Sequence, residues 1–136
     1  MMLLIDTNIF LEVMLGQTRQ HDCAEFLTQV RTGGKTAAIT NFSVYSIMIV
    51  LAKEKKLLEL KTFLQSLNAY AGLTIHAPST NDLLKAAELV TDGKFDIDDG
   101  IQYASANSLA AEGIVSLDKH FDNHEIPRIE PASPQV

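Results

Sequence analysis

Two aspartates in this sequence each follow a short apolar run. Asp6 ends the stretch LLID, and Asp118 ends the stretch GIVSLD. Aspartate is rarely buried without a partner. A carboxylate at the end of a buried strand is therefore either neutralised by a neighbour or placed to bind something positively charged. Asp6 could also cap the helix that follows it, but two acids at two strand ends are harder to explain by capping alone.

A second acidic segment, FDIDDG, supplies three more carboxylates. It places Asp96, Asp98 and Asp99 at the start of a predicted helix, just before the strand that leads to Asp118. Helix capping and the N-terminal helix dipole also explain acids at such positions, and for Asp98 we favour that explanation. Because another helix comes before this one, the sequence leaves open which edge of the sheet the segment reaches.

Carboxylates that are brought together repel each other, and their pKa values rise unless a cation binds. Ligand sets made only of oxygen select hard cations, chiefly Mg²⁺ or Mn²⁺. Such a cation lowers the pKa of a bound water and neutralises the charge that develops during phosphodiester hydrolysis. The acidic residues are therefore consistent with metal-dependent cleavage of a phosphodiester.

The elements that must position these acids alternate between short apolar strands and amphipathic helices. This alternation predicts an α/β domain with a mainly parallel sheet and helices on both faces. Ligands bind such sheets at the carboxyl ends of the strands, where Asp6 and Asp118 would share one edge. We predict strands within 3–7, 37–40, 73–77 and 113–118, a short edge strand within 126–131, and helices within 8–16, 19–34, 43–56, 57–70, 79–93 and 96–113.

The composition fits a single globular domain. The chain has 136 residues, of which 46% are hydrophobic and 21% charged, which is enough to bury one core. We predict one domain over residues 1–130 and a flexible tail over 131–136. The net charge of −6 argues against holding nucleic acid by overall charge, so such contact would need a local patch, a metal ion or a basic partner. The sequence carries neither a signal peptide nor a membrane-spanning run, which predicts a cytoplasmic protein.

The two acidic blocks together resemble the PIN-domain family, which includes the VapC ribonuclease toxins of bacterial and archaeal toxin–antitoxin pairs. LLIDTNIFLEV is similar to the opening strand of the family, with Asp6 as the first acid and Thr7 and Asn8 in their usual places. The resemblance spans nearly the whole chain. Either block alone would be weak, whereas both in this order are fairly specific.

The second block is FDIDDGIQYASANSLAAEGIVSLDKHF. It resembles a family signature in which an acid precedes a small residue on a helix, and a strand then leads to a hydroxyl residue, an acid and Phe. The matching residues are Asp99, Ser116, Asp118 and Phe121, and Asp96 also fits the pattern. Gly100 stands where the family usually has Ala, which is a mild departure.

The resemblance implies a three-layer α/β fold with about five parallel strands flanked by helices. It implies an acidic pocket that binds Mg²⁺ or Mn²⁺ and cleaves RNA endonucleolytically. It also implies homodimers and, for the toxins, a small antitoxin that holds the protein inactive. We expect Asp6, Asp99 and Asp118 to be the catalytic and metal-binding residues, with Thr7, Asn8, Ser46, Asp96 and Ser116 in supporting positions.

One position departs from the family pattern. The helix after the second strand usually carries a Glu, and the matching residue here is Ser46. Glu54 lies two turns further along the helix, which is too far to substitute. Serine brings no charge, so the affinity for a metal ion should be lower.

Two main functional alternatives therefore stay open. The first is a metal-dependent endoribonuclease that acts as a toxin. The second is a PIN-fold module that binds RNA or protein, with weak or lost catalysis because Ser46 replaces the usual Glu. A phosphoacceptor receiver domain would also place acids at strand ends, but it needs an acidic pair near the first strand, which LLIDTN lacks.

Overall fold

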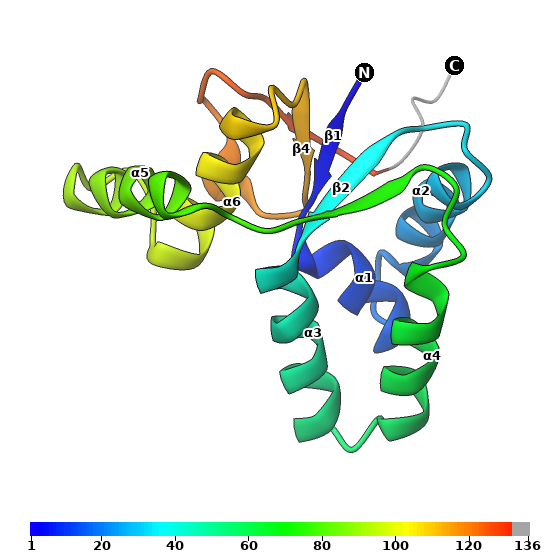
Figure 1. Ribbon diagram of the computed structural model, residues 1–136. Coiled ribbons are helices and arrows are strands. Elements are labelled where there is room, and N and C mark those ends of the chain that lie inside the picture. Colours follow the sequence, from blue (N-terminus) through cyan, green and yellow to red (C-terminus); the bar gives the residue numbers. More distant parts are fainter. Residues whose placement is uncertain (132–136) are drawn as a thin grey trace.

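A five-stranded parallel sheet forms the centre of the protein. Figure 1 shows the computed structural model, which describes residues 1–131. The strand order is β3-β2-β1-β4-β5, and every neighbouring pair runs parallel. The predicted α/β fold with a parallel sheet of about five strands is thus confirmed. The strands are β1 (Leu3–Ile5), β2 (Ala37–Thr40), β3 (Leu73–His76), β4 (Gly113–Val115) and β5 (Arg128–Ile129).

Helices cover both faces of the sheet and give the predicted three layers (Figure 1). The first four helices pack on one face, together with Leu3 and Ile5 of β1. The last two pack on the other face, against Leu4. The helices are α1 (Thr7–Met14), α2 (Gln20–Arg31), α3 (Asn41–Lys53), α4 (Leu57–Leu67), α5 (Thr80–Thr91) and α6 (Ile97–Ser108), with a short 3₁₀ helix η1 (Lys119–Phe121).

The central strand β1 is buried on both faces. Leu3, Leu4 and Ile5 are at most 4% exposed, and a strand that is covered on both sides needs such an uninterrupted apolar run. Its neighbours are β2 on one side and β4 on the other. The chain first moves outward through β2 and β3 and then returns to β4 beside β1. The direction in which successive strands are added to the sheet therefore reverses between β1 and β4. Ligands bind at such a position in folds of this kind.

Two helical hairpins border the carboxyl edge of the sheet. In Figure 1, α3 and α4 extend together beyond this edge, whereas α5 and α6 lie at the left of the view, on the opposite face of the sheet. The Thr40 side chain accepts a hydrogen bond from the Ser43 amide at 3.0 Å, which caps α3 directly after β2. Gly100 allows α5 and α6 to pack closely, because a Cβ at this position would lie 3.2 Å from the Ala86 carbonyl oxygen.

The structure answers the question of where the acidic start of α6 lies. The turn after α5 brings it to the carboxyl edge, next to the ends of β1 and β4. Within residues 1–131, no helix is long and apolar enough to cross a membrane. Of the predicted tail, residues 132–136 lie outside the part of the chain that the structure describes.

Candidate metal-binding site

A pocket of about 220 Å³ opens at the carboxyl ends of β1 and β4. The pairing of Ile5 with Val115 places the residues that follow these two strands side by side. Four carboxylates line the pocket, contributed by Asp6, Asp98, Asp99 and Asp118. Thr7, Asn8, Leu11, Phe42, Ser46 and Gln102 complete the lining.

Asp6 forms the buried floor of the pocket and is only 7% exposed. Its Oδ1 accepts hydrogen bonds from the Thr7 amide at 2.8 Å and from Gln102 Nε2 at 3.0 Å. Its Oδ2 accepts one from Ser116 Oγ at 2.6 Å. Burial raises the pKa of Asp6 above its ordinary value although these three donors lower it. A cation in the pocket would compensate the buried charge.

Asp99, Asp118 and His120 form a second group at the mouth of the pocket. His120 Nδ1 lies 3.3 Å from Asp99 Oδ2 and 3.2 Å from Asp118 Oδ1. Burial, and next the charge of Asp118, raises the pKa of Asp99 to about 6. The hydrogen bond with Asp99 and the charge of Asp118 raise the pKa of His120. This part of the site therefore carries more negative charge than its surroundings neutralise.

A buried network of polar side chains holds the floor of the pocket. Gln102 Nε2 donates both to Asp6 and to Ser43 Oγ, the latter at 2.8 Å. Gln102 Oε1 accepts a hydrogen bond from Thr40 Oγ1 at 3.1 Å, and Thr7 Oγ1 donates to Ser43 Oγ at 2.8 Å. The network links four elements, so the orientation of the Asp6 carboxylate is set by contacts from both faces of the sheet.

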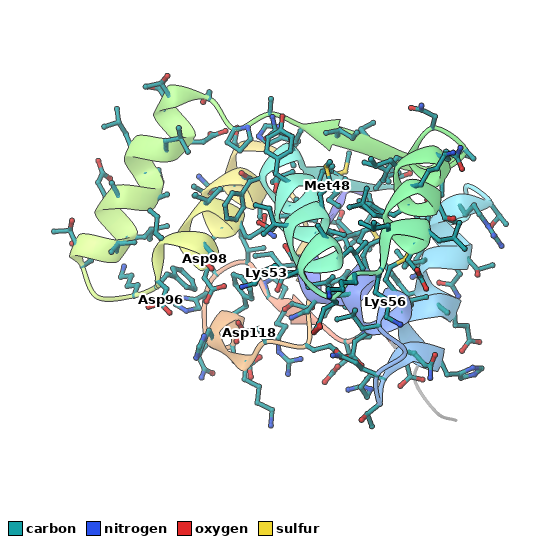
Figure 2. The ribbon with its side chains drawn as sticks, turned by 90° about the horizontal axis from the view of Figure 1, so that it is seen from below. Met48, Lys53, Lys56, Asp96, Asp98 and Asp118 are labelled. Atoms are coloured by element: carbon teal, nitrogen blue, oxygen red, sulfur yellow. The ribbon has the colours of Figure 1, made fainter. Side chains whose placement is uncertain are left out.

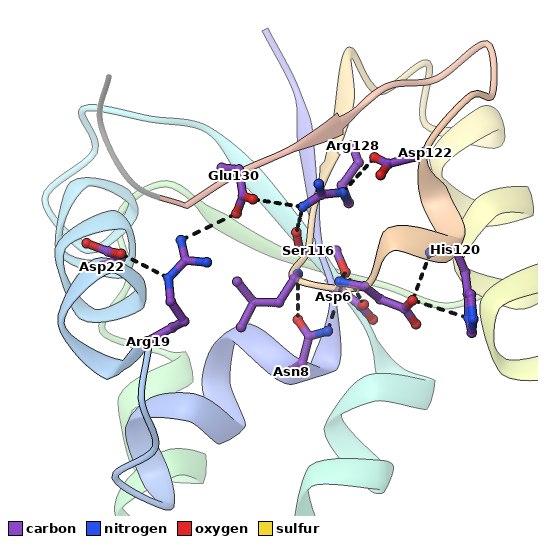
Figure 3. Close-up of polar contacts among 11 residues, drawn as sticks. Asp6, Asn8, Arg19, Asp22, Ser116, His120, Asp122, Arg128 and Glu130 are labelled. Carbon is purple, nitrogen blue, oxygen red and sulfur yellow. Dashed lines mark hydrogen bonds and ion pairs between the residues drawn. The ribbon is translucent and has the colours of Figure 1, made fainter. Parts of the chain in front are cut away.

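Asn8 and Ser116 join the segments that follow β1 and β4 (Figure 3). Asn8 Nδ2 donates to Ser116 Oγ at 3.4 Å, and Asn8 Oδ1 accepts from the Leu117 amide at 3.4 Å. The Asp118 amide in turn donates to Ser116 Oγ at 2.9 Å. These contacts fix Asp118 relative to Asp6.

The structure brings most of the predicted site residues together. Ser46 lines the pocket from α3 and supplies a hydroxyl group there. Glu54 lies at the C-cap of the same helix, beyond the residues that line the pocket. Asp96 is placed differently, because it lines a neighbouring hollow with Asp99 and His120. The predicted site residues that line or contact the pocket are Asp6, Thr7, Asn8, Ser46, Asp99, Ser116 and Asp118.

Sequence reasoning missed three residues of the site. Asp98, which we favoured as a helix cap, lines the pocket. For His120 the sequence, which shows no metal-ligand spacing of histidines, favours a surface or structural role, yet it contacts two of the acids. Gln102 was overlooked as well. The one signal for Gln102 was its polar side chain on an otherwise small and apolar stretch, one turn after the acidic segment.

These residues have the chemistry of a divalent cation site. One ligand atom each from Asp99, Asp118 and His120 can be chosen so that all three lie within 4.8 Å of one another. Carboxylate oxygens suit Mg²⁺ and Mn²⁺, and an imidazole nitrogen is a better ligand for Mn²⁺ than for Mg²⁺. Asp6 adds a further carboxylate on the floor of the same pocket.

The sequence profile described as the PIN domain matches residues 3–126. This chain belongs to the PIN-domain family. The resemblance drawn from the two acidic blocks is therefore confirmed, and PIN domains are a family of nucleases. A comparison with curated protein sequences finds no match.

Solved structures of toxin–antitoxin proteins share this PIN fold. The chain is similar to one in a toxin–antitoxin complex from Klebsiella pneumoniae, with a TM-score of 0.73 and 17% identity over 96% of this chain and 98% of that one. VapBC2 from Rickettsia felis, bound to a promoter DNA fragment, gives a TM-score of 0.71 and 17% identity over 96% and 98%. VapC20 from Mycobacterium tuberculosis, a Sarcin-Ricin loop cleaving toxin, gives 0.70 and 8% identity over 86% and 90%.

Proposed function

We propose that this PIN domain is a metal-dependent endoribonuclease that acts as the toxin of a toxin–antitoxin pair. The observation that carries the proposal is the acidic pocket between β1 and β4. Four carboxylates line it, and burial and mutual repulsion raise the pKa values of two of them. Such a pocket lowers its free energy by binding a cation.

Each residue of the pocket has a distinct task in this proposal. Asp6, Asp99 and Asp118 would hold Mg²⁺ or Mn²⁺. The bound metal would supply an activated water and neutralise the charge on the reacting phosphate. Ser116 and Gln102 keep the Asp6 carboxylate in one orientation through their hydrogen bonds. Asn8 holds the Asp118 segment against the end of β1.

The second candidate is a PIN-fold module that binds RNA or protein without efficient catalysis. Ser46 favours it, because this position brings a hydroxyl rather than a charge to the pocket. The ionic contacts of His120 with Asp99 and Asp118 also favour it, because a protonated imidazole competes with a metal ion for the same oxygens.

A metal-dependent cleavage assay separates the two candidates. We would incubate RNA with wild type, Asp6→Asn and a control, Asp92→Asn, in Mn²⁺ and in EDTA. Asp92 is an exposed acid at the C-cap of α5, outside the acidic pocket. If the protein is a nuclease, Asp6→Asn should reduce cleavage by more than the roughly 10- to 100-fold that losing an outer-sphere partner costs. Cleavage that persists in Asp6→Asn, or none by wild type under conditions where RNA binds, contradicts catalysis.

The partners follow from the same proposal. Similar structures contain antitoxin proteins, so we propose that a small antitoxin inhibits this chain and that the chain forms a homodimer. An antitoxin would insert a basic side chain among the acids of the pocket. The test is to search the adjacent reading frame for a short protein, to co-express it with this chain, and to measure whether the pair co-purifies and loses RNA cleavage. An adjacent reading frame without such a protein, or a pair that does not co-purify, would contradict this partner.

A further inference from the structure

A second concave surface lies beside the acidic pocket and has a different chemical character. It is a hollow of about 500 Å³ formed by α5, α6 and the segment after η1. We call it the basic–aromatic hollow, because two lysines and three aromatic rings contribute to its lining. Its lining includes Lys85, Lys94, Phe95, Tyr103, Asn123 and His124.

The three aromatic rings pack against one another in one cluster. The Phe95 ring centroid lies 4.4 Å from that of His124 and 5.1 Å from that of Tyr103. The Tyr103 hydroxyl accepts a hydrogen bond from the Ile126 amide at 3.1 Å, which fixes the ring. His124 and Tyr103 are only half-buried, so part of each ring faces the hollow. Partly exposed rings of this kind are the surfaces on which single-stranded bases stack.

The lysines give the hollow an excess of positive charge. Lys85 on α5 and Lys94 in the turn before α6 are both exposed. Within residues 1–131 no lysine forms an ion pair, so what sets Lys85 and Lys94 apart is their place on the lining of the hollow. Glu125 also lines the hollow, and its single charge leaves the lysines in excess.

The basic–aromatic hollow and the acidic pocket both adjoin a third hollow. A hollow of about 440 Å³ lies between them. It shares Lys94 and Phe95 with the basic–aromatic hollow, and it shares Asp99 with the acidic pocket. Figure 2 shows Asp96 and Asp98 where the turn from α5 into α6 approaches the segment that carries Asp118. Three adjoining hollows thus lie in a row from the acids to the aromatic cluster.

We propose that the basic–aromatic hollow binds the nucleotides that flank the scissile phosphate of a single-stranded RNA. This inference rests on the proposed ribonuclease function. An acidic pocket in a chain of net charge −6 repels RNA, so the strand needs an anchor elsewhere. Lys85 and Lys94 would pair with phosphates next to the cleaved one, and a neighbouring base would stack on His124 or Tyr103. Asn123 offers an amide for hydrogen bonds to that base.

Binding of RNA to a non-cleaving background tests the lysines. The probe is a fluorescein-labelled, unstructured RNA of about 12 nucleotides, within the usual range of single-strand site sizes. Its fluorescence anisotropy gives the Kd for two proteins. One is the Asp6→Asn variant, and the other is the same variant with Lys85→Gln and Lys94→Gln added. The matched control carries Lys35→Gln and Lys61→Gln, two exposed lysines that line neither hollow.

The double substitution Lys85→Gln and Lys94→Gln should raise the Kd for the RNA roughly tenfold at about 0.1 M salt. The control double substitution should change this Kd much less. The slope of log Kd against log salt should fall by about 1.4, because each phosphate contact to a single strand contributes about 0.7. An equal loss of RNA affinity in the two double variants would overturn the proposal. So would an unchanged salt slope in the variant that lacks Lys85 and Lys94.

The aromatic part has its own test. His124→Ala should weaken RNA binding at least about fivefold, as the loss of one stacked base does. Because His124 packs on Phe95, the variant is compared only if it melts like its parent. If it does not, NMR of Asp6→Asn with the same RNA replaces it. The amide resonances of Lys94, Asn123 and His124 should then shift, and a footprint that omits them would contradict the site.

The outcomes distinguish this inference from the proposed function. Suppose that wild type cleaves RNA in a metal-dependent way and that the lysine substitutions do not change RNA binding. This result would refute the RNA-binding role of the hollow without contradicting the proposed ribonuclease function. Lysine-dependent binding without any cleavage would support the hollow as an RNA site and refute catalysis.

Discussion

Replacing Asp99 by asparagine should stabilise the metal-free protein at neutral pH. Burial and the charge of Asp118 raise the pKa of Asp99 from 3.8 to about 6. The folded protein therefore holds a proton on Asp99 more tightly than the unfolded chain does. Between about pH 4 and pH 6 the folded state binds more protons, so the free energy of unfolding contributed by Asp99 must fall as the pH rises.

The magnitude follows from the size of this pKa change. A rise from 3.8 to about 6 corresponds to about 3 kcal/mol at ~1.4 kcal/mol per pH unit. The Asp99 side chain is only 16% exposed, so solvent screens little of this energy. The variant also loses the ionic contact of Asp99 with His120, so we expect a net stabilisation of about 1–3 kcal/mol above pH 7. The benefit should disappear below about pH 4, where both states are protonated.

Urea unfolding in EDTA measures this effect. The quantity of interest is the difference in unfolding free energy between Asp99→Asn and wild type, followed from about pH 4 to pH 8. The control is Asp92→Asn at the C-cap of α5. A difference that stays flat with pH, or that shows Asp99→Asn becoming relatively less stable as the pH rises, would refute the reasoning. In saturating Mn²⁺, wild type should become more stable than Asp99→Asn. Only wild type keeps all the carboxylate ligands, so only wild type gains the full increase in unfolding free energy that metal binding provides by mass action.

Three further predictions concern the same pocket. Ser46→Glu should tighten Mn²⁺ binding about tenfold, by calorimetry, and speed RNA cleavage, because it adds a carboxylate ligand; a loss of stability without tighter binding would show instead that the pocket is overfilled. Millimolar Mn²⁺ should raise the melting temperature of wild type but not of Asp118→Asn, and no shift in wild type would contradict an assembled site. Gln102→Leu should lower the unfolding free energy in urea by about 1–3 kcal/mol, because it removes one of the buried donors to Asp6 and to Ser43 and leaves the Thr40 hydroxyl without its acceptor. Gln65→Leu on the exposed face of α4 should change it little.

The sheet could be predicted because its signals are local and repeated. Leu3, Leu4 and Ile5 form an uninterrupted apolar run, as a strand covered on both faces requires. The strand pattern also placed Asp6 and Asp118 at the same edge, because the carboxyl ends of parallel strands share an edge in any strand order. The neighbouring positions of β1 and β4 then bring the two acids into one pocket.

The remaining parts of the site depend on contacts between distant segments. Gln102 reaches Asp6 across 96 positions of the chain, and Thr40 across 62. Asp98 is a helix-start acid in sequence, and it lines the pocket only because the turn after α5 returns to the carboxyl edge. His120 gains its contacts because η1 turns it back toward α6. Periodicity and composition contain none of this information, since they describe each element separately.

The pocket has a structural cost that fits a site built for a cation. Burial holds Asp6 and Asp99 with raised pKa values, although a fold selected for stability alone would place apolar residues there. Gln102, Ser116 and Thr7 direct their donors at Asp6. Within residues 1–131, the ion pairs of Asp99 and Asp118 at the mouth are made with the exposed His120 alone. The floor is therefore fixed and the mouth is incompletely neutralised. An ion that binds at the mouth would displace a proton from Asp99 or His120, so metal affinity should rise with pH through the range in which these two groups titrate.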